Sequence, residues 1–113
     1  MNIFHRDLSN RWILLSIFEQ MADIGAEVGR SINWKKKNNL KMSTNAFYRA
    51  LELIDYTIED LKNKNRLSEL LRMRELLVDY LIGENIYHSS EDEWNKYFYY
   101  FNFAARNPHG SNK

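Results

Sequence analysis

The sequence predicts an all-α protein, and two observations favour that fold class. Only 4 glycines and 1 proline occur in 113 residues, whereas a β-sheet protein of this size needs many tight turns. Along most of the chain, apolar side chains recur at spacings of three and four residues, which is the period of one helix face. We therefore expect a four-helix antiparallel bundle with a long first helix around one core.

The chain has the length and composition of one domain. Its 113 residues match a domain of ordinary size. Hydrophobic residues make up 44% of the chain, which is enough to fill a core and too many for a disordered segment. We assign residues 1–107 to a single helical-bundle domain and expect residues 108–113 to form a flexible C-terminal tail.

The first predicted helix covers residues 8–34. Its apolar stripe consists of Leu14, Ile17, Phe18, Met21, Ile24, Val28 and Ile32. Gly25 and Gly29 lie beside this stripe, and each costs about 1 kcal/mol of helix stability relative to alanine. We expect another helix to approach closely there. Residues 35–43 break the pattern and predict a polar, basic loop, after which Ser43 or Thr44 caps the next helix.

Two further amphipathic helices are predicted over residues 45–62 and 66–82. The short polar segment 63–65 between them predicts a tight turn, so these two helices should be antiparallel neighbours. Gly83 follows the second of them, where a helix C-cap glycine is expected. Each helix carries one continuous apolar face toward the common core.

A fourth helix is predicted to begin at Ser90 and to end near Asn107. Ser90 and Glu93 have the spacing of a capping box. Seven aromatic residues then fall within ten positions. They are Trp94, Tyr97, Phe98, Tyr99, Tyr100, Phe101 and Phe103.

These aromatic residues cannot all share one face of the helix. Tyr99, Tyr100 and Phe103 fall outside the expected core stripe, and exposed aromatic residues are enriched at protein interfaces. We therefore predict a homodimer, since closed twofold dimers are the commonest assemblies. Alternatively, Ile3 and Phe4 of the N-terminal segment fold over this second face.

Arg74 lies in the third predicted helix, over residues 66–82. The apolar spacing of that helix predicts an apolar residue at this position. A buried guanidinium needs a carboxylate partner, and Glu27 and Asp55 are the candidates. With the polar residues beside that stripe, the candidate network comprises Glu27, Asp55, Arg72, Arg74, Glu75 and Asp79. If buried, it would form a ligand-binding or enzymatic site. Alternatively, Arg74 carries its charge to the rim and the other residues form a solvated face.

Other chemistries find little support in the sequence. Metal sites in helical bundles use Glu-x-x-His pairs, and none of His5, His88 and His109 forms one. Cysteine is absent, and Ser89 and Ser90 beside His88 are better explained as helix caps. A glycine-rich phosphate loop is also missing. We expect no catalytic residue, no metal and no cofactor, and we lean away from an enzyme.

The charge balance argues against a nucleic-acid partner. Sixteen basic residues against fifteen acidic ones leave a net charge of +1, without the basic excess of nucleic-acid binders. Trp34, Lys35, Lys36 and Lys37 are the candidate contacts, since lysines bind phosphate and an indole stacks on bases. Alternatively, these lysines form a solvated loop that complements the C-terminal end of the first helix. We favour this alternative.

The sequence also predicts the cellular location. No run approaches the ~18 apolar residues of a membrane span, and the first residues do not resemble an export signal. A secreted chain this small would often use disulfides, and this one has no cysteine. We therefore expect a cytoplasmic protein that does not contact a membrane.

Three stretches resemble an uncharacterised family of small all-helical prokaryotic proteins. They are 24–30 (IGAEVGR, followed by Trp34), 49–55 (RALELID) and 74–80 (RELLVDY). More loosely, the four-helix plan is similar to the HEPN superfamily, which includes nucleotide-binding partners of nucleotidyltransferases and metal-independent ribonucleases. The ribonuclease members carry an arginine followed by four to six residues and then a histidine. No arginine holds that position before His88 or His109.

Taken together, these features predict a non-catalytic helical-bundle module that self-associates through its aromatic fourth helix. A protein or a nucleotide is the expected class of additional partner. The alternatives are a ligand-binding or enzymatic bundle built on the Arg74 network, and a nucleic-acid-binding module that uses the lysine segment 35–37.

Overall fold

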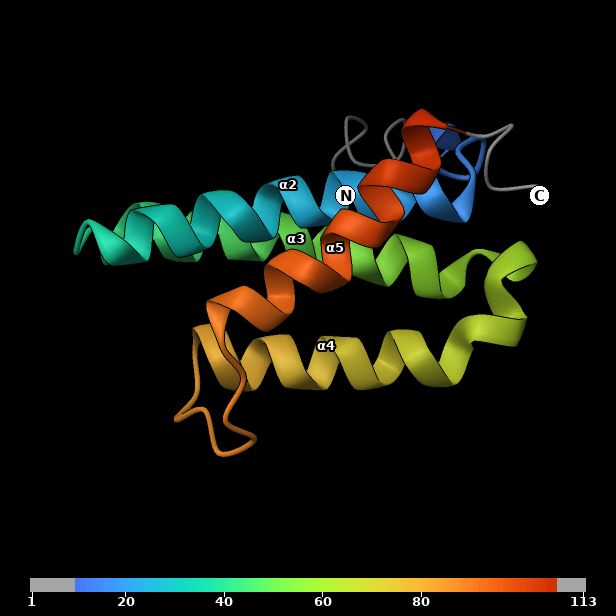
Figure 1. Cartoon of the computed structure of the whole chain (residues 1–113). Coiled ribbons are helices and arrows are strands. Elements are labelled where there is room, and N and C mark those ends of the chain that lie inside the picture. Colours follow the sequence, from blue (N-terminus) through green and yellow to red (C-terminus); the bar gives the residue numbers. More distant parts are fainter. Residues whose placement is uncertain (1–9, 108–113) are drawn as a thin grey trace.

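The computed structural model describes residues 10–107, and within this range all regular structure is helical (Figure 1). The elements are α2 (Ile17–Lys36), α3 (Leu40–Glu59), a 3₁₀ helix η1 (Leu61–Arg66), α4 (Leu67–Leu81) and α5 (Glu91–Arg106). The predicted all-α class is confirmed. The predictions for Ile3, Phe4 and the tail 108–113 lie outside the described residues.

The first helix begins later than predicted, so the continuous helix over 8–34 is wrong. Turn residues 13–15 separate the helical residues 10–12 from α2. Ser16 caps α2 with a capping box. Its Oγ accepts from the Glu19 backbone N at 3.1 Å, and Glu19 Oε1 accepts from Ser16 N at 2.9 Å. This turn also leaves Leu14, which the predicted stripe includes, exposed to solvent.

The basic loop predicted over 35–43 is also wrong, because both flanking helices extend into it. Only residues 37–39 connect α2 to α3. Asn39 caps α3 by accepting from Met42 N at 3.1 Å. Asn38 adopts a φ of 61°, a left-handed conformation that asparagine tolerates better than most residues. An Asn-Asn pair thus supplies both the turn and the cap.

Ser43 joins the two helices instead of capping the second. It is buried, and its Oγ donates to the Ser31 carbonyl at 2.7 Å. In return, Ser31 Oγ donates to the Ser43 carbonyl at 2.8 Å. The exchange satisfies both hydroxyls inside the α2–α3 contact, where an unpaired hydroxyl would be unfavourable.

The helices form a layer of three with the fourth laid across it. In Figure 1, α2, α3 and α4 lie roughly parallel to one another and alternate in direction, with α3 contacting both of the others, while α5 crosses α2 diagonally. The predicted second helix ends earlier, at Glu59, and η1 replaces the tight turn at 63–65. The regular antiparallel four-helix bundle is therefore not confirmed.

The core lies where these elements meet. All four α-helices and the segment before α2 contribute to it. Its buried members include Met21, Ile24 and Val28 of α2, Phe47, Ala50 and Ile54 of α3, Leu70 and Leu77 of α4, Phe101 of α5, and Trp12. Apart from Trp12, they fall on the helix faces that the apolar spacing predicts.

Gly25 lies where α5 crosses α2. A Cβ at this position would lie 2.9 Å from three atoms of the Phe98 side chain, which is too close for a real contact. The expected close approach of another helix is thus confirmed at Gly25. It is wrong at Gly29, where an added Cβ would meet no atom within 4 Å.

The two glycines should respond oppositely to alanine. Gly25→Ala should lower the free energy of unfolding by about 1–3 kcal/mol, because its methyl group overpacks Phe98. Gly29→Ala should raise it by about 0.5–1 kcal/mol, since the site is open and alanine favours the helix. Urea unfolding of dilute protein measures both changes. Shifts of the same sign would contradict this account of the crossing.

Candidate functional site

A buried polar cluster connects α2, α3 and η1 at one end of the molecule. Gln20 Nε2 donates to the Trp12 carbonyl at 3.0 Å and to Asp60 Oδ2 at 2.9 Å. Asn63 Nδ2 donates to Gln20 Oε1 at 2.8 Å and to the Thr57 carbonyl at 3.0 Å. Trp12 Nε1 donates to Thr57 Oγ1 at 2.8 Å. These groups satisfy one another, so the cluster is structural.

Asp60 carries the charge of this cluster. Burial raises the pKa of its carboxyl group, but hydrogen bonds from Lys62 and Gln20 outweigh burial and bring the pKa below its ordinary value of 3.8. The Lys62 ammonium contacts Asp60 Oδ2 and also donates to the Ile13 carbonyl at 3.0 Å. The apolar spacing of the sequence does not predict this cluster. The available signal was Gln20, a polar residue next to Met21 in the apolar stripe.

The predicted Arg74 network divides into separate pairs. Arg74 Nε donates to Asp55 Oδ1 at 2.8 Å, and the two side chains are 37% and 47% exposed. Glu27 instead pairs with Arg30 at 2.9 Å and with Arg49 at 3.4 Å. Arg74 therefore carries its charge to the surface, as the alternative interpretation held. The network does not form a site in the core.

The other three members of the predicted network hold the loop between α4 and α5. The two carboxylate oxygens of Asp79 accept from Ile86 N at 2.8 Å and from Tyr87 N at 3.0 Å. Tyr87 donates its hydroxyl to Glu75 at 2.9 Å, and the Arg72 guanidinium lies 5.1 Å from the centre of the Tyr87 ring. These residues position Tyr87 beside a pocket.

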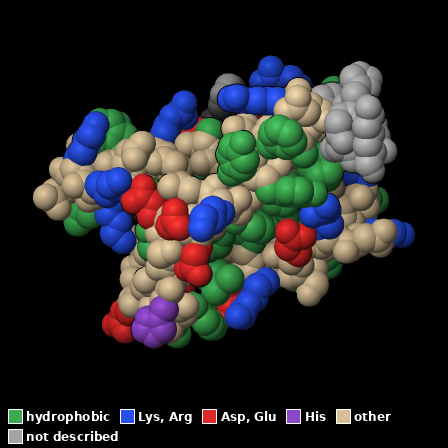
Figure 2. Space-filling view, viewed as in Figure 1, with side chains coloured by type: hydrophobic (Ala, Val, Ile, Leu, Met, Phe, Trp, Pro, Cys, Tyr) green, Lys and Arg blue, Asp and Glu red, His purple; other side chains and the backbone are tan. Residues whose placement is uncertain are grey.

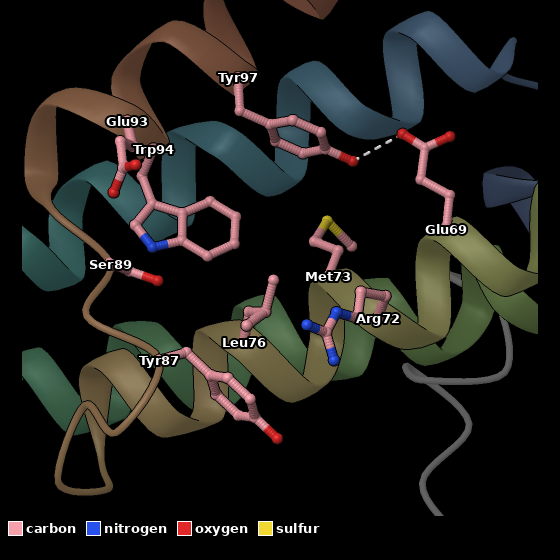
Figure 3. A pocket seen from close by; sticks show the side chains of 9 residues that line it. All are labelled: Glu69, Arg72, Met73, Leu76, Tyr87, Ser89, Glu93, Trp94 and Tyr97. Carbon is pink, nitrogen blue, oxygen red and sulfur yellow. Dashed lines mark hydrogen bonds between the residues drawn. The ribbon is translucent and has the colours of Figure 1, made fainter.

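This pocket, of about 420 Å³, lies between α4, the loop after it and the start of α5 (Figure 3). Its lining residues are Glu69, Arg72, Met73, Leu76, Tyr87, Ser89, Glu93, Trp94 and Tyr97. Tyr97 donates its hydroxyl to Glu69 Oε2 at 2.8 Å. Burial and this hydrogen bond raise the pKa of Tyr97 far above its ordinary value, so the phenol stays protonated. Of the predicted site residues, only Arg72 lines the pocket.

Trp94 forms one wall of the pocket and carries an unsatisfied donor. Its ring stacks on Phe98 with centroids 6.0 Å apart and meets the edge of Tyr97 at 5.8 Å. Its Nε1 exposes less than 1 Å² and has no hydrogen-bond partner. Within residues 10–107 no other side-chain polar atom is both buried and unpartnered. A buried indole N–H usually finds an acceptor, so this one is notable.

The three predicted interface residues lie on the outer side of α5. Tyr99, Tyr100 and Phe103 are 66%, 57% and 55% exposed. Tyr99 stacks on Phe103 with ring centroids 6.3 Å apart. Figure 2 shows hydrophobic side chains gathered over this part of α5.

A groove of about 380 Å³ runs beside these aromatic residues, between α2 and α5. Gly25, Ala26 and Gly29 line it from α2, where the only side chain among the three is a methyl group. From α5 it is lined by three aromatic and three polar residues: Trp94, Phe98, Tyr99, Asn95, Asn102 and Arg106. The groove has open space at Gly29, where an added Cβ would meet no atom within 4 Å.

The predicted nucleic-acid candidates have partners within the protein. Lys35 donates to the Tyr80 carbonyl at 3.4 Å, and Lys36 pairs with Glu91 at 3.2 Å. Lys37 Nζ lies 5.3 Å from the centre of the Trp34 ring. Lys35 and Lys36 belong to the last turn of α2, where basic residues complement the helix dipole.

Comparisons with protein-family models, with curated proteins and with solved structures find no match for this chain. The resemblances noted in the sequence therefore stay predictions. Among residues 10–107, no three His, Asp or Glu side chains gather in a way that could hold a metal ion. No helix in the same range is long and apolar enough to cross a membrane.

The Asp60 carboxylate should make stability depend on pH. Because its pKa is lower in the folded state than in the unfolded state, it stabilises the fold above about pH 4 and loses this effect as the pH falls further. Asp60→Asn should therefore be less stable at about pH 7 and should lose less stability on acidification. Urea midpoints at about pH 7 and pH 3 test this. Equal acid sensitivity of variant and wild type would count against the assigned role.

The Arg74–Asp55 pair should contribute little to stability. Exposed ion pairs contribute about 1 kcal/mol or less, so Arg74→Met should change the free energy of unfolding by no more than that. A double-mutant cycle with Asp55→Ala measures the coupling directly. A coupling of several kcal/mol would show that the pair is buried in solution.

Proposed function

We propose that this protein is a small, non-catalytic helical-bundle module that associates with a second copy of itself through α5. The supporting observation is the exposure of Tyr99, Tyr100 and Phe103, each more than half open to solvent on one helix. Aromatic residues are enriched at interface centres, where they bury large areas at a small entropic cost.

The shape of this surface supports a second copy as the partner. The stacked pair of Tyr99 and Phe103 forms a ridge, and the groove beside it has open space above Gly29. Ridge and groove belong to the same face of the molecule. A twofold rotation would place the ridge of each copy against the groove of the other, which is the self-complementary contact that closed dimers require.

Charge also permits self-association. The net charge of +1 gives two copies little mutual repulsion. Arg106 is the only charged residue lining the groove, and Asn95 and Asn102 offer hydrogen bonds at its rim. A stable dimer buries about 800 Å² on each partner, so the aromatic ridge would form the centre and the flanking α2 and α5 surfaces would supply the rest.

The proposed function also covers the location of the protein, its additional partners and the two alternative functions. We propose a cytoplasmic protein, because a secreted chain of this size would often carry disulfides and this one has no cysteine. A protein or nucleotide partner would be additional to the dimer. The surface position of Arg74 weighs against an enzymatic site in the core, and the internal partners of Lys35–Lys37 weigh against nucleic acid.

The proposed dimer predicts a specific change in mass. Wild-type protein should sediment as a dimer at about 100 μM, whereas the double variant Tyr99→Ser/Phe103→Ser should sediment as a monomer, because loss of interface aromatics costs about 2 kcal/mol or more each. Sedimentation equilibrium between about 1 and 100 μM measures the association.

Tyr48→Ser is the matched control, since Tyr48 is a similarly exposed tyrosine on α3, away from the ridge. It should leave the association unchanged. Circular dichroism of each variant checks that the helices remain folded. A wild-type monomer throughout this range, or equal weakening by Tyr48→Ser, would refute the proposed interface.

A further inference from the structure

We propose that the pocket between α4 and α5 binds a small, uncharged molecule that offers a hydrogen-bond acceptor to the Trp94 indole. This pocket lies between α4 and α5, whereas the self-association groove lies between α2 and α5, with Trp94 lining both, and a ligand site here goes beyond the proposed function. Its volume of about 420 Å³ lies within the range of small-molecule sites, which is roughly 300–1,000 Å³.

The hydrogen bonds already made by the pocket residues indicate which chemical group a ligand must supply. Glu69 already accepts from Arg66 and Tyr97, and Glu93 accepts from Ser90. Trp94 Nε1 donates to nothing, although an indole N–H can act only as a donor. The unmet requirement of this pocket is therefore an acceptor, such as the oxygen of an amide or of a ring carbonyl.

The segment that carries Ser89 lies beside Nε1 (Figure 3). Figure 3 shows Nε1 on the edge of the indole that faces the segment carrying Ser89. The Ser89 backbone is held by two hydrogen bonds to the Asn85 side chain, both 2.9 Å long. Its hydroxyl makes no hydrogen bond with the described residues, so the Ser89 side chain can change rotamer without losing one.

The residues that line the pocket disfavour a charged ligand. Two carboxylates, Glu69 and Glu93, border the pocket and would repel an anion. The one cation, Arg72, already lies over Tyr87 and 3.8 Å from Glu75. A cation would leave Trp94 without an acceptor. The aromatic and aliphatic walls, including Met73 and Leu76, suit a flat, uncharged ring.

The test uses benzamide as the probe, followed through the indole N–H resonances of the full-length protein. The chain has 3 tryptophans and so gives three such resonances, which Trp→Phe variants assign. Benzamide should move the Trp94 resonance in a saturable way. The Trp12 resonance should stay in place, because its N–H already donates to Thr57.

Two phenylalanine variants distinguish binding in the pocket from binding at the exposed surface of α4. Leu76→Phe places a ring in the pocket and should weaken benzamide binding about 10-fold or abolish it. Leu71→Phe makes the same change at an exposed position of α4 outside the pocket and should leave binding unchanged. Both variants keep Trp94, so its resonance also reports whether the fold is intact.

Benzoate and benzylamine complete the experiment. Both should bind more weakly than benzamide and move the Trp94 resonance less. The proposal is overturned if the Trp94 resonance stays in place up to about 20 mM benzamide, since ligands of this size ordinarily bind a suitable pocket at that concentration. Equal shifts at Trp12, indifference to Leu76→Phe, or tighter binding of benzylamine would overturn it as well.

Discussion

The contact between Gly25 and Phe98 determines how the rest of the molecule is arranged. Two helices approach this closely only where one of them has no Cβ, so α5 can cross α2 at this point and not along its whole length. The diagonal crossing sends the first turns of α5 toward α4, where they form the pocket beside Trp94. It also leaves the outer face of Tyr99 and Phe103 without cover from the described helices.

A second constraint acts at the end of the molecule where α3 turns toward α4. Gln20 bridges Asp60 and Asn63 within a buried, fully paired cluster. A buried polar group that lacks a hydrogen-bond partner destabilises the fold. The cluster therefore favours the one alignment of α2, α3 and η1 in which every hydrogen bond is made. Apolar packing alone would discriminate less sharply between such alignments.

The predictions that succeeded depend on local chemistry or on helix periodicity. The capping box of Ser90 and Glu93 starts α5 as the sequence indicates, and Gly25 marks a close helix contact. The same local rule applies at Ser16 and Glu19, but a continuous apolar stripe hid that helix start. The run of lysines after Trp34 resembles a loop, although two of these lysines complete the last turn of α2.

The features that the sequence did not reveal depend on which helices meet. Nothing local shows that Asp55, and not Glu27, pairs with Arg74, because that choice follows from how α3 and α4 align. The pocket combines residues from α4, the following loop and α5. The position of α5 depends in turn on its contact with Gly25, which is far from these residues in the sequence. The exposure of Tyr99 and Phe103 could be anticipated because both lie on one helix.

The central claim is that the face carrying Tyr99 and Phe103 contacts the groove of a second copy. The most direct measurement is an isotope-filtered NOE experiment on an equal mixture of labelled and unlabelled protein, which records only contacts between copies. The account predicts intermolecular NOEs from the ring protons of Tyr99 and Phe103 to Gly29 and Ala26. Their absence at a concentration where the protein is dimeric, or NOEs from a different surface, would contradict it.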